Sequence, residues 1–160
     1  MDDLCLTPPF TSLGYRLSLV RHLWARRADA ALDPTGLTHM QFFMMRMIEQ
    51  VSGLGRVPSQ THLAGALHTD RMTVSKVVRT LEAKGIVERA VHPDDPRANS
   101  VALTSRGRSI LADATRLVTA EQDRFFGQLG PDRAKFGTML DRLLAGEAPC
   151  APSTLALEAR

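Results

Sequence analysis

The side chains best suited to chemistry in this sequence are cations and hydroxyls on one face of a predicted helix. Helical spacing of four apolar residues predicts a helix over residues 71–84 with one buried face: Val74, Val77, Val78 and Leu81. The opposite face carries Arg71, Thr73, Ser75, Lys76 and Arg79. Arg and Lys can donate hydrogen bonds to guanine O6 and N7, and Ser and Thr can bond base edges or phosphates. The pattern fits a helix that reads the DNA major groove, but an amphipathic helix with a solvated polar face fits it equally well.

The segment before this helix completes the pattern of a helix-turn-helix over residues 60–79. Ala64 is small where the two helices would cross, and Thr69 and Asp70 can cap the second helix. His68 stands where such a turn usually holds glycine, so we expect a left-handed backbone at this position. Three polar residues at the start of the first helix can bind a phosphate at its N-terminus: Ser59, Gln60 and Thr61.

A β-hairpin is predicted directly after the second helix. Gly85 provides the helix C-cap, and two β-branched strands follow over residues 86–91 and 100–104, with a polar loop over 92–99. Asp95 precedes Arg97 near the tip of this loop and can hold its guanidinium outward, towards a minor groove. A surface ion pair in a turn is the plainer alternative. The order of helix-turn-helix, hairpin and tip arginine favours DNA binding.

Three runs in the centre of the chain carry a family resemblance: SKVVRTLEAKGIVER over 75–89, HPDDPR over 92–97 and VALTSRG over 101–107. Together with Gly36-Leu37-Thr38 and Gln41-Phe42, these runs are similar to the MarR family of bacterial regulators over roughly residues 13–144. The resemblance implies a winged-helix homodimer on double-stranded DNA with a palindromic operator, usually repressing and often released by small aromatic or phenolic ligands. It also implies that Asp95 and Arg97 are the pair in the wing, whereas His68 and Pro96 depart from the family pattern.

Further helices are predicted on both sides of this region. One begins near Thr11, a second begins at a capping box formed by Thr38 and Gln41, a third is capped by Thr104 or Ser105, and Pro131 starts the last. The predicted fold class is mainly α with a small β-hairpin wing, a winged helix-turn-helix with N- and C-terminal dimerisation helices. The predicted division is a flexible arm (1–10), a dimerisation helix (11–36), a DNA-binding lobe (37–104), C-terminal dimerisation helices (105–145) and a disordered tail (146–160).

The first helix is apolar over a wide arc. Leu19 and Leu23 lie beside a stripe made of Leu13, Leu17, Val20, Trp24, Ala28 and Ala31. Such an arc predicts burial against two surfaces, the helix's own lobe and a second subunit, although packing within a monomer is an alternative. A small aromatic effector is expected to bind where the first, second and fifth helices meet the DNA-binding lobe. The residues proposed for it are His22, Trp24, His39, Met40, Phe43 and Met44, each of which can also be ordinary core.

The overall charge of +3 is small, but nine Lys/Arg against five Asp/Glu between Arg56 and Arg108 place the basic excess in the middle of the chain. The absence of hydrolase, phosphate-loop and clustered metal-ligand motifs argues against an enzyme, and no metal or cofactor is predicted. Cys5 and Cys150, far apart and without a secretory signal, indicate a cytoplasmic protein. Two alternatives stay open: a peroxide-responsive regulator that uses Cys5, and a winged-helix module that binds protein rather than DNA.

Overall fold

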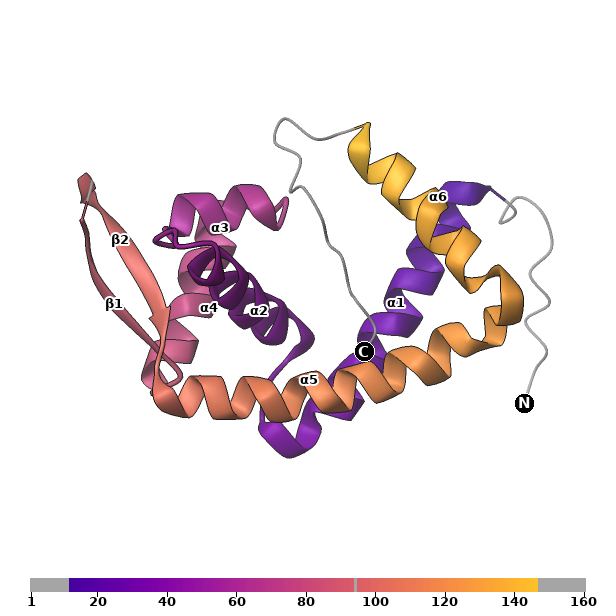
Figure 1. Cartoon of the computed structure of the whole chain (residues 1–160), viewed down its shortest axis with the longest axis horizontal. Helices are drawn as coiled ribbons and strands as arrows, with labels where there is room; N and C mark the ends of the chain where they lie inside the picture. The colour runs from indigo at the N-terminus through magenta and orange to yellow at the C-terminus, as the bar shows by residue number, and fades with distance from the viewer. Residues whose placement is uncertain (1–11, 94, 147–160) are drawn as a thin grey trace. The chain divides into compact units, whose positions relative to one another are not determined.

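The structure, a computed structural model, describes residues 12–93 and 95–146, and of residues 95–98 it describes the backbone alone (Figure 1). The elements in chain order are α1 (Leu13–Leu32), η1 (Asp33–Thr35), α2 (His39–Gly53), α3 (Gln60–Ala66), α4 (Arg71–Ala83), β1 (Val87–His92), β2 (Asp95–Leu103), α5 (Ser105–Phe126), η2 (Gly127–Asp132) and α6 (Arg133–Ala145). Helices and one antiparallel hairpin make up the described part of the chain, which confirms the predicted fold class. The predicted N-terminal arm and the tail from residue 147, with Cys5 and Cys150, lie outside the described residues.

The chain divides into two compact units, Met1–Gln122 and Asp123–Arg160, with the boundary inside α5. The core of the first unit joins α2, α3 and α4 to the base of the hairpin and to the first half of α5. Its largest fully buried side chains are Leu32, Met44, Met45, Ile48, Leu63, Leu81, Leu111, Val74, Val78 and Val101. The face of α4 that the spacing predicted to be buried is therefore the face that packs.

Side-chain caps begin the helices of the first unit at the predicted positions. Thr38 accepts from the amide of Gln41 at 3.3 Å, and the Gln41 side chain accepts from the Thr38 amide at 3.2 Å, which confirms the capping box. The side chains of Ser59 and Asp70 cap α3 and α4 by accepting from the amides of His62 and Thr73. Thr104, one of the two predicted candidates, accepts from the amide of Gly107 at 3.0 Å at the start of α5.

A close backbone approach fixes the start of α5 against the base of the hairpin. A Cβ atom on Gly107 would lie 2.1 Å from the carbonyl oxygen of Ile86, so only glycine fits there. The amide of Thr104 donates to this carbonyl at 3.1 Å. The Thr104 hydroxyl also donates to the carbonyl of Gly85 at 2.8 Å. The end of α4, the beginning of β1 and the beginning of α5 are thereby joined at one place.

The hairpin is longer than the sequence predicts. The strands pair from Val87↔Leu103 to Val91↔Asn99, and after a register shift they pair again at His92↔Asp95. The predicted loop over residues 92–99 is therefore wrong, since most of it belongs to β2. Its polar, proline-containing composition resembles a turn, but both strands of a two-stranded hairpin are edge strands, where proline is tolerated.

The second unit contains the end of α5, η2 and α6. Phe126 contacts Phe125 and Phe136 with ring centroids 4.9 Å and 6.3 Å apart, and Arg133 forms an ion pair with Asp123 at 2.7 Å. Pro131 lies in η2 and α6 begins at Arg133, so the last helix begins slightly later than predicted. None of the helices among the described residues is long and apolar enough to cross a membrane.

Candidate nucleic-acid interface

The turn between α3 and α4 sets the angle of the candidate recognition helix. His68 has a φ of 45°, so the left-handed backbone expected at this position is confirmed. The amide of His68 donates to the carbonyl of Gly65 at 3.1 Å, and that of Thr69 donates to the carbonyl of Ala64 at 3.0 Å. Ala64 is buried where the helices cross. The two helices therefore pack closely despite the missing glycine.

The N-terminus of α4 is organised by one carboxylate. Asp70 accepts from the amide of Thr73 at 2.8 Å through Oδ1 and from the Thr73 hydroxyl at 2.7 Å through Oδ2. These bonds, the one from the hydroxyl first, lower the pKa of Asp70 below its ordinary value. Because Thr73 donates its hydroxyl proton to Asp70, the hydroxyl oxygen of Thr73 is available to a ligand as a hydrogen-bond acceptor.

The exposed face of α4 and the first residue of α3 line one open depression of about 580 Å³. Its lining residues are Gln60, Arg71, Met72, Thr73, Ser75, Lys76 and Arg79. Six of the ten residues predicted to bind DNA are therefore brought together. Met72, which sequence analysis omitted, is 82% exposed in the first turn of α4 and presents an apolar group beside the cations. An apolar residue among the polar residues of this helix face is the feature of the sequence that could have identified it.

The other predicted residues of this region have different surroundings. Ser59 is buried, and its hydroxyl caps α3 by accepting from the amide of His62 at 3.2 Å. Thr61 is exposed in the first turn of α3. The side chains of Asp95 and Arg97 lie outside the described part of the structure, although their backbone belongs to β2. The geometry of the predicted wing pair stays a prediction.

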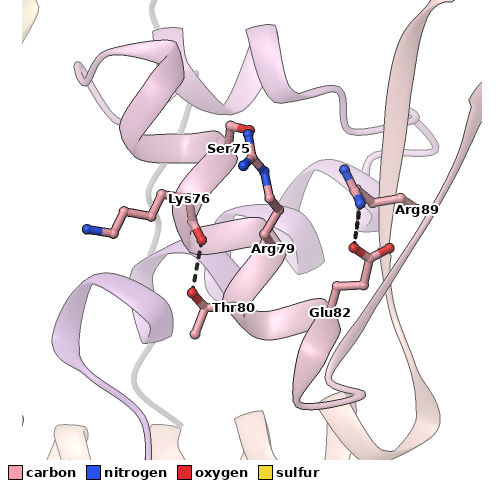
Figure 2. A network of polar contacts seen from close by, with 6 residues as sticks. All are labelled: Ser75, Lys76, Arg79, Thr80, Glu82 and Arg89. Carbon is pink, nitrogen blue, oxygen red and sulfur yellow. Dashed lines mark hydrogen bonds and ion pairs between the residues drawn. The ribbon is translucent and has the colours of Figure 1, made fainter.

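Internal contacts orient the polar face of α4, as Figure 2 shows. Arg79 is turned towards Ser75 and donates to its hydroxyl oxygen at 2.9 Å, while Lys76 extends away from this pair. The hydroxyl of Thr80 donates to the carbonyl of Lys76 at 3.0 Å. The Arg79 guanidinium has further N–H groups for a ligand, so the bond to Ser75 can hold it in one orientation without using its donor capacity.

An ion pair joins the recognition helix to the hairpin. Arg89 of β1 donates to Oε2 of Glu82 from Nε at 2.9 Å and approaches it with Nη2 at 2.6 Å (Figure 2). The bond from Arg89 lowers the pKa of Glu82, and the same bond raises the pKa of Arg89. This pair was not predicted from the sequence, although the two residues flank Gly85, where the chain reverses. The pair sets the base of the hairpin against the side of α4.

The residues predicted to bind an effector separate into a cluster and three others. The ring of His39 lies between those of Trp24 and Phe43, with centroid distances of 5.9 Å and 4.6 Å. Its buried Nε2 has no hydrogen-bond partner among the described residues. Burial lowers the pKa of His39, and the charge of Asp29, whose Oδ1 accepts from the His39 amide at 2.6 Å, acts in the opposite direction. The cluster therefore offers a neutral imidazole nitrogen between aromatic rings.

The three others lie outside this cluster. Met40 is exposed beside it, Met44 is fully buried in the core, and His22 is exposed on α1, 3.2 Å from the guanidinium of Arg21. No group of three or more His, Cys, Asp or Glu residues that could hold a metal ion occurs in the part of the chain that the structure describes.

Comparison with known proteins identifies the family. The model of the MarR family matches residues 37–98. The uncharacterized HTH-type transcriptional regulator YdcH of Bacillus subtilis is 36% identical over 118 residues, which are 74% of this chain and 80% of that protein. The chain belongs to the MarR family. The HTH-type transcriptional repressor Rv2887 of Mycobacterium tuberculosis is 33% identical over 132 residues, 82% of this chain and 92% of that protein. The predicted class, a winged helix-turn-helix transcriptional regulator, is thereby confirmed.

Solved structures of the MarR family include similar chains in two bound states. The transcriptional repressor CouR bound to a 23-mer DNA duplex has a TM-score of 0.79 and 27% identity, covering 89% of this chain and 99% of that one. CouR from Rhodococcus jostii RHA1 bound to p-coumaroyl-CoA has a TM-score of 0.74 and 26% identity, covering 88% of this chain and 95% of that one.

Proposed function

We propose that this MarR-family regulator is a homodimeric repressor that binds a pseudo-palindromic operator through α4 and its hairpin wing. The observation that carries the proposal is the depression on α4, where Arg71, Lys76 and Arg79 gather with hydroxyl groups on a helix whose opposite face is buried. Cations and hydroxyls on one exposed helix match the donor and acceptor pattern of the major groove. The CouR–DNA complex supports the choice of partner by its similarity.

Each part of the surface has a distinct proposed role. Arg79, oriented by Ser75, and Lys76 contact base edges, while Arg71 and Thr73 at the start of α4 lie closer to phosphates. The N-terminus of α3 binds a phosphate through its amides and the side chains of Gln60 and Thr61, while the buried Ser59 caps the helix. Arg97, held by Asp95, enters the minor groove from the wing.

Dimerisation is proposed through the terminal helices, residues 11–36 and 105–145. Leu13 of α1 is 84% exposed in the single chain and Leu17 is 51% exposed, and in α6 Leu143 and Leu144 are 65% and 61% exposed. Such side chains indicate surfaces that a second subunit covers. A twofold dimer places its two recognition helices about 34 Å apart, one turn of DNA.

A small aromatic effector is proposed to act at the cluster of Trp24, His39 and Phe43. The rings offer stacking, and Nε2 of His39 offers a hydrogen bond that the described residues leave unused. The complex of CouR with p-coumaroyl-CoA supports an effector with an aromatic acyl group by similarity. The ligand reduces DNA binding by favouring a dimer whose recognition helices are misplaced.

The test is selection of bound duplexes from a random-sequence library by the purified full chain, followed by sequencing. We expect an inverted repeat with half-sites about 10 bp apart from centre to centre. Affinity for this duplex should fall steeply with salt, because each neutralised phosphate releases counterions. Enrichment of no common sequence would reject operator recognition and favour the protein-binding alternative.

A further inference from the structure

The recognition helix ends in a lysine whose side chain is committed to a distant part of the first unit. Lys84 is the C-cap residue of α4. Its Nζ donates to the carbonyl of Gly36 at 2.7 Å and to Oε1 of Gln41 at 3.3 Å. The two acceptors precede Lys84 by 48 and 43 positions and belong to the junction between α1 and α2. One side chain therefore connects the recognition helix to this junction.

Both acceptors are held in place by bonds of their own. Gly36 has a φ of 66°, and its amide donates to the carbonyl of Asp33 at 3.1 Å. Gln41 is buried, and its Oε1 also accepts from the amide of Thr38 in the capping box at 3.2 Å. Lys84 is thus bonded to two acceptors whose positions are fixed by other hydrogen bonds.

The same junction is bonded to α1. The amide of His39, the first residue of α2, donates to Oδ1 of Asp29 in α1 at 2.6 Å. Through the backbone of residues 38–41, polar contacts therefore link α1 to the start of α2 and the start of α2 to the end of α4. Lys84 supplies the last of these contacts, and its ammonium also lies where the negative end of the α4 dipole favours a cation.

A contact between Lys84 and a DNA phosphate is the obvious alternative use of this cation. The depression on α4 is lined by residues from the N-terminal part of the helix up to Arg79, and Lys84 is not among them. Its Nζ already has two acceptors within the protein. The observed geometry favours a role inside the protein over a role in the interface.

We propose that Lys84 is a positioning residue that fixes the angle of α4 relative to α1 and thereby the separation of the two recognition helices in the dimer. For its effect on DNA this inference rests on the proposed function. If α1 joins the two subunits, the operator spacing that the dimer accepts depends on how rigidly each α4 is held to its own α1. Without the bonds from Lys84, the dimer should therefore accept a wider range of operator spacings.

The DNA experiment compares wild type with Lys84→Met, which removes the charge and the donors, and Lys84→Arg, which retains them. Arg46→Met is the matched control, because it removes an exposed cation of α2 that lies outside the depression on α4 and outside the helices proposed to form the dimer. Affinities are measured by fluorescence anisotropy on the selected operator, on versions with one base pair added or removed between half-sites, and on a single half-site. One base pair rotates a half-site by about 35° and shifts it by about 3.4 Å.

We expect Lys84→Met to bind the selected operator about five- to tenfold more weakly, because α4 is then held less firmly in the orientation that the operator requires and must be ordered on binding. When the spacing is altered, the affinity of Lys84→Met should fall at least about threefold less than that of wild type. Lys84→Arg and Arg46→Met should behave like wild type. Equal weakening on all duplexes and on the half-site would overturn the proposal, and a salt slope lower by about one would assign a phosphate contact instead. Unchanged binding by Lys84→Met would also overturn it.

A second experiment needs no DNA and separates failure of the link from failure of the proposed function. Gln41→Glu replaces the amide oxygen that accepts from Lys84 by a carboxylate of similar shape. In the Gln41→Glu single variant Lys84 can pair with this carboxylate, but in the double variant with Lys84→Met the buried charge has no ammonium beside it. Urea unfolding of the two single variants and the double variant should therefore show strong coupling. Additive effects of the two substitutions on the free energy of unfolding would show that Lys84 and Gln41 do not interact. This conclusion does not depend on what the protein binds.

Discussion

Replacement of Gly107 by alanine tests the close approach of α5 to the base of the hairpin. The added Cβ would lie 2.1 Å from the carbonyl oxygen of Ile86 and 3.3 Å from its Cγ2. A carbon and an oxygen in ordinary contact are about 3.3 Å apart, so the backbone must separate by about 1 Å. This movement strains the bond from the Thr104 amide to the same carbonyl, now 3.1 Å.

The magnitude follows from three contributions. Overpacking of a rigid contact costs about 1–3 kcal/mol, and the weakened hydrogen bond costs about 1 kcal/mol. Alanine gains about 1 kcal/mol over glycine within a helix. We therefore expect Gly107→Ala to lower the free energy of unfolding by about 1–3 kcal/mol.

Gly65→Ala provides the matched control in the same unit. Gly65 lies inside α3, and a Cβ atom there has nothing within 4 Å, so alanine should raise the free energy of unfolding by about 0.5–1 kcal/mol. Both variants are unfolded in urea at the same protomer concentration, because dimerisation contributes to apparent stability. The reasoning would be refuted if Gly107→Ala were as stable as wild type, or if both substitutions shifted the midpoint in the same direction.

Four further results are expected. Arg79→Ala should weaken binding to the selected operator by about 1–3 kcal/mol in an anisotropy titration and reduce discrimination at one base pair, while Arg46→Ala, at an exposed cation of α2, binds like wild type. Glu82→Ala removes the acceptor through which Arg89 is bonded to α4 and should weaken operator binding while leaving Arg71 and Lys76 in place. Unchanged affinity would show that the ion pair does not contribute to DNA binding. The pKa of Asp70 is lowered in the fold, so its stabilisation is present above the unfolded pKa and lost as pH falls through the folded value. The stability difference between wild type and Asp70→Ala, followed by urea unfolding against pH, should therefore shrink in acid. Burial also lowers the pKa of His39, so wild type should lose stability as pH falls below 6.5 more than His39→Phe does, and parallel pH curves would contradict this reading.

Local signals in the sequence predicted much of the fold because caps and helical spacing act over a few residues. Thr38, Ser59 and Asp70 cap the helices as expected, and the left-handed turn at His68 follows from its place in the helix-turn-helix. The predicted polar face of α4 lines one depression for the same reason, since the spacing of Val74, Val78 and Leu81 fixes which side is buried. Within one helix, the spacing of residues determines the site.

Contacts between distant segments could not be predicted in this way. The partners of Lys84 lie more than forty positions earlier, and a lysine at a helix end has the same appearance in the sequence whether it is solvated or bonded. Gly107 shows no turn signal because its role is close contact with Ile86 rather than a positive φ. The hairpin length was wrong because strand pairing depends on the register of the partner strand, which a polar composition does not reveal.

The two ends of α4 are consequently held by different kinds of contact. At its N-terminus the capping bonds come from Asp70, one residue before the helix, so they move with it. At its C-terminus Lys84 is bonded to the α1–α2 junction, and the carbonyls of Gly85 and Ile86 are bonded to Thr104 before α5. A shift of α1 or α5 therefore acts on the C-terminal end of α4, while the cationic depression lies towards its N-terminal end. Rotation of α4 about the end that carries Lys84 would displace Arg71 more than Arg79, so phosphate contacts at the start of the helix should be the first that a ligand-induced change in α1 disrupts.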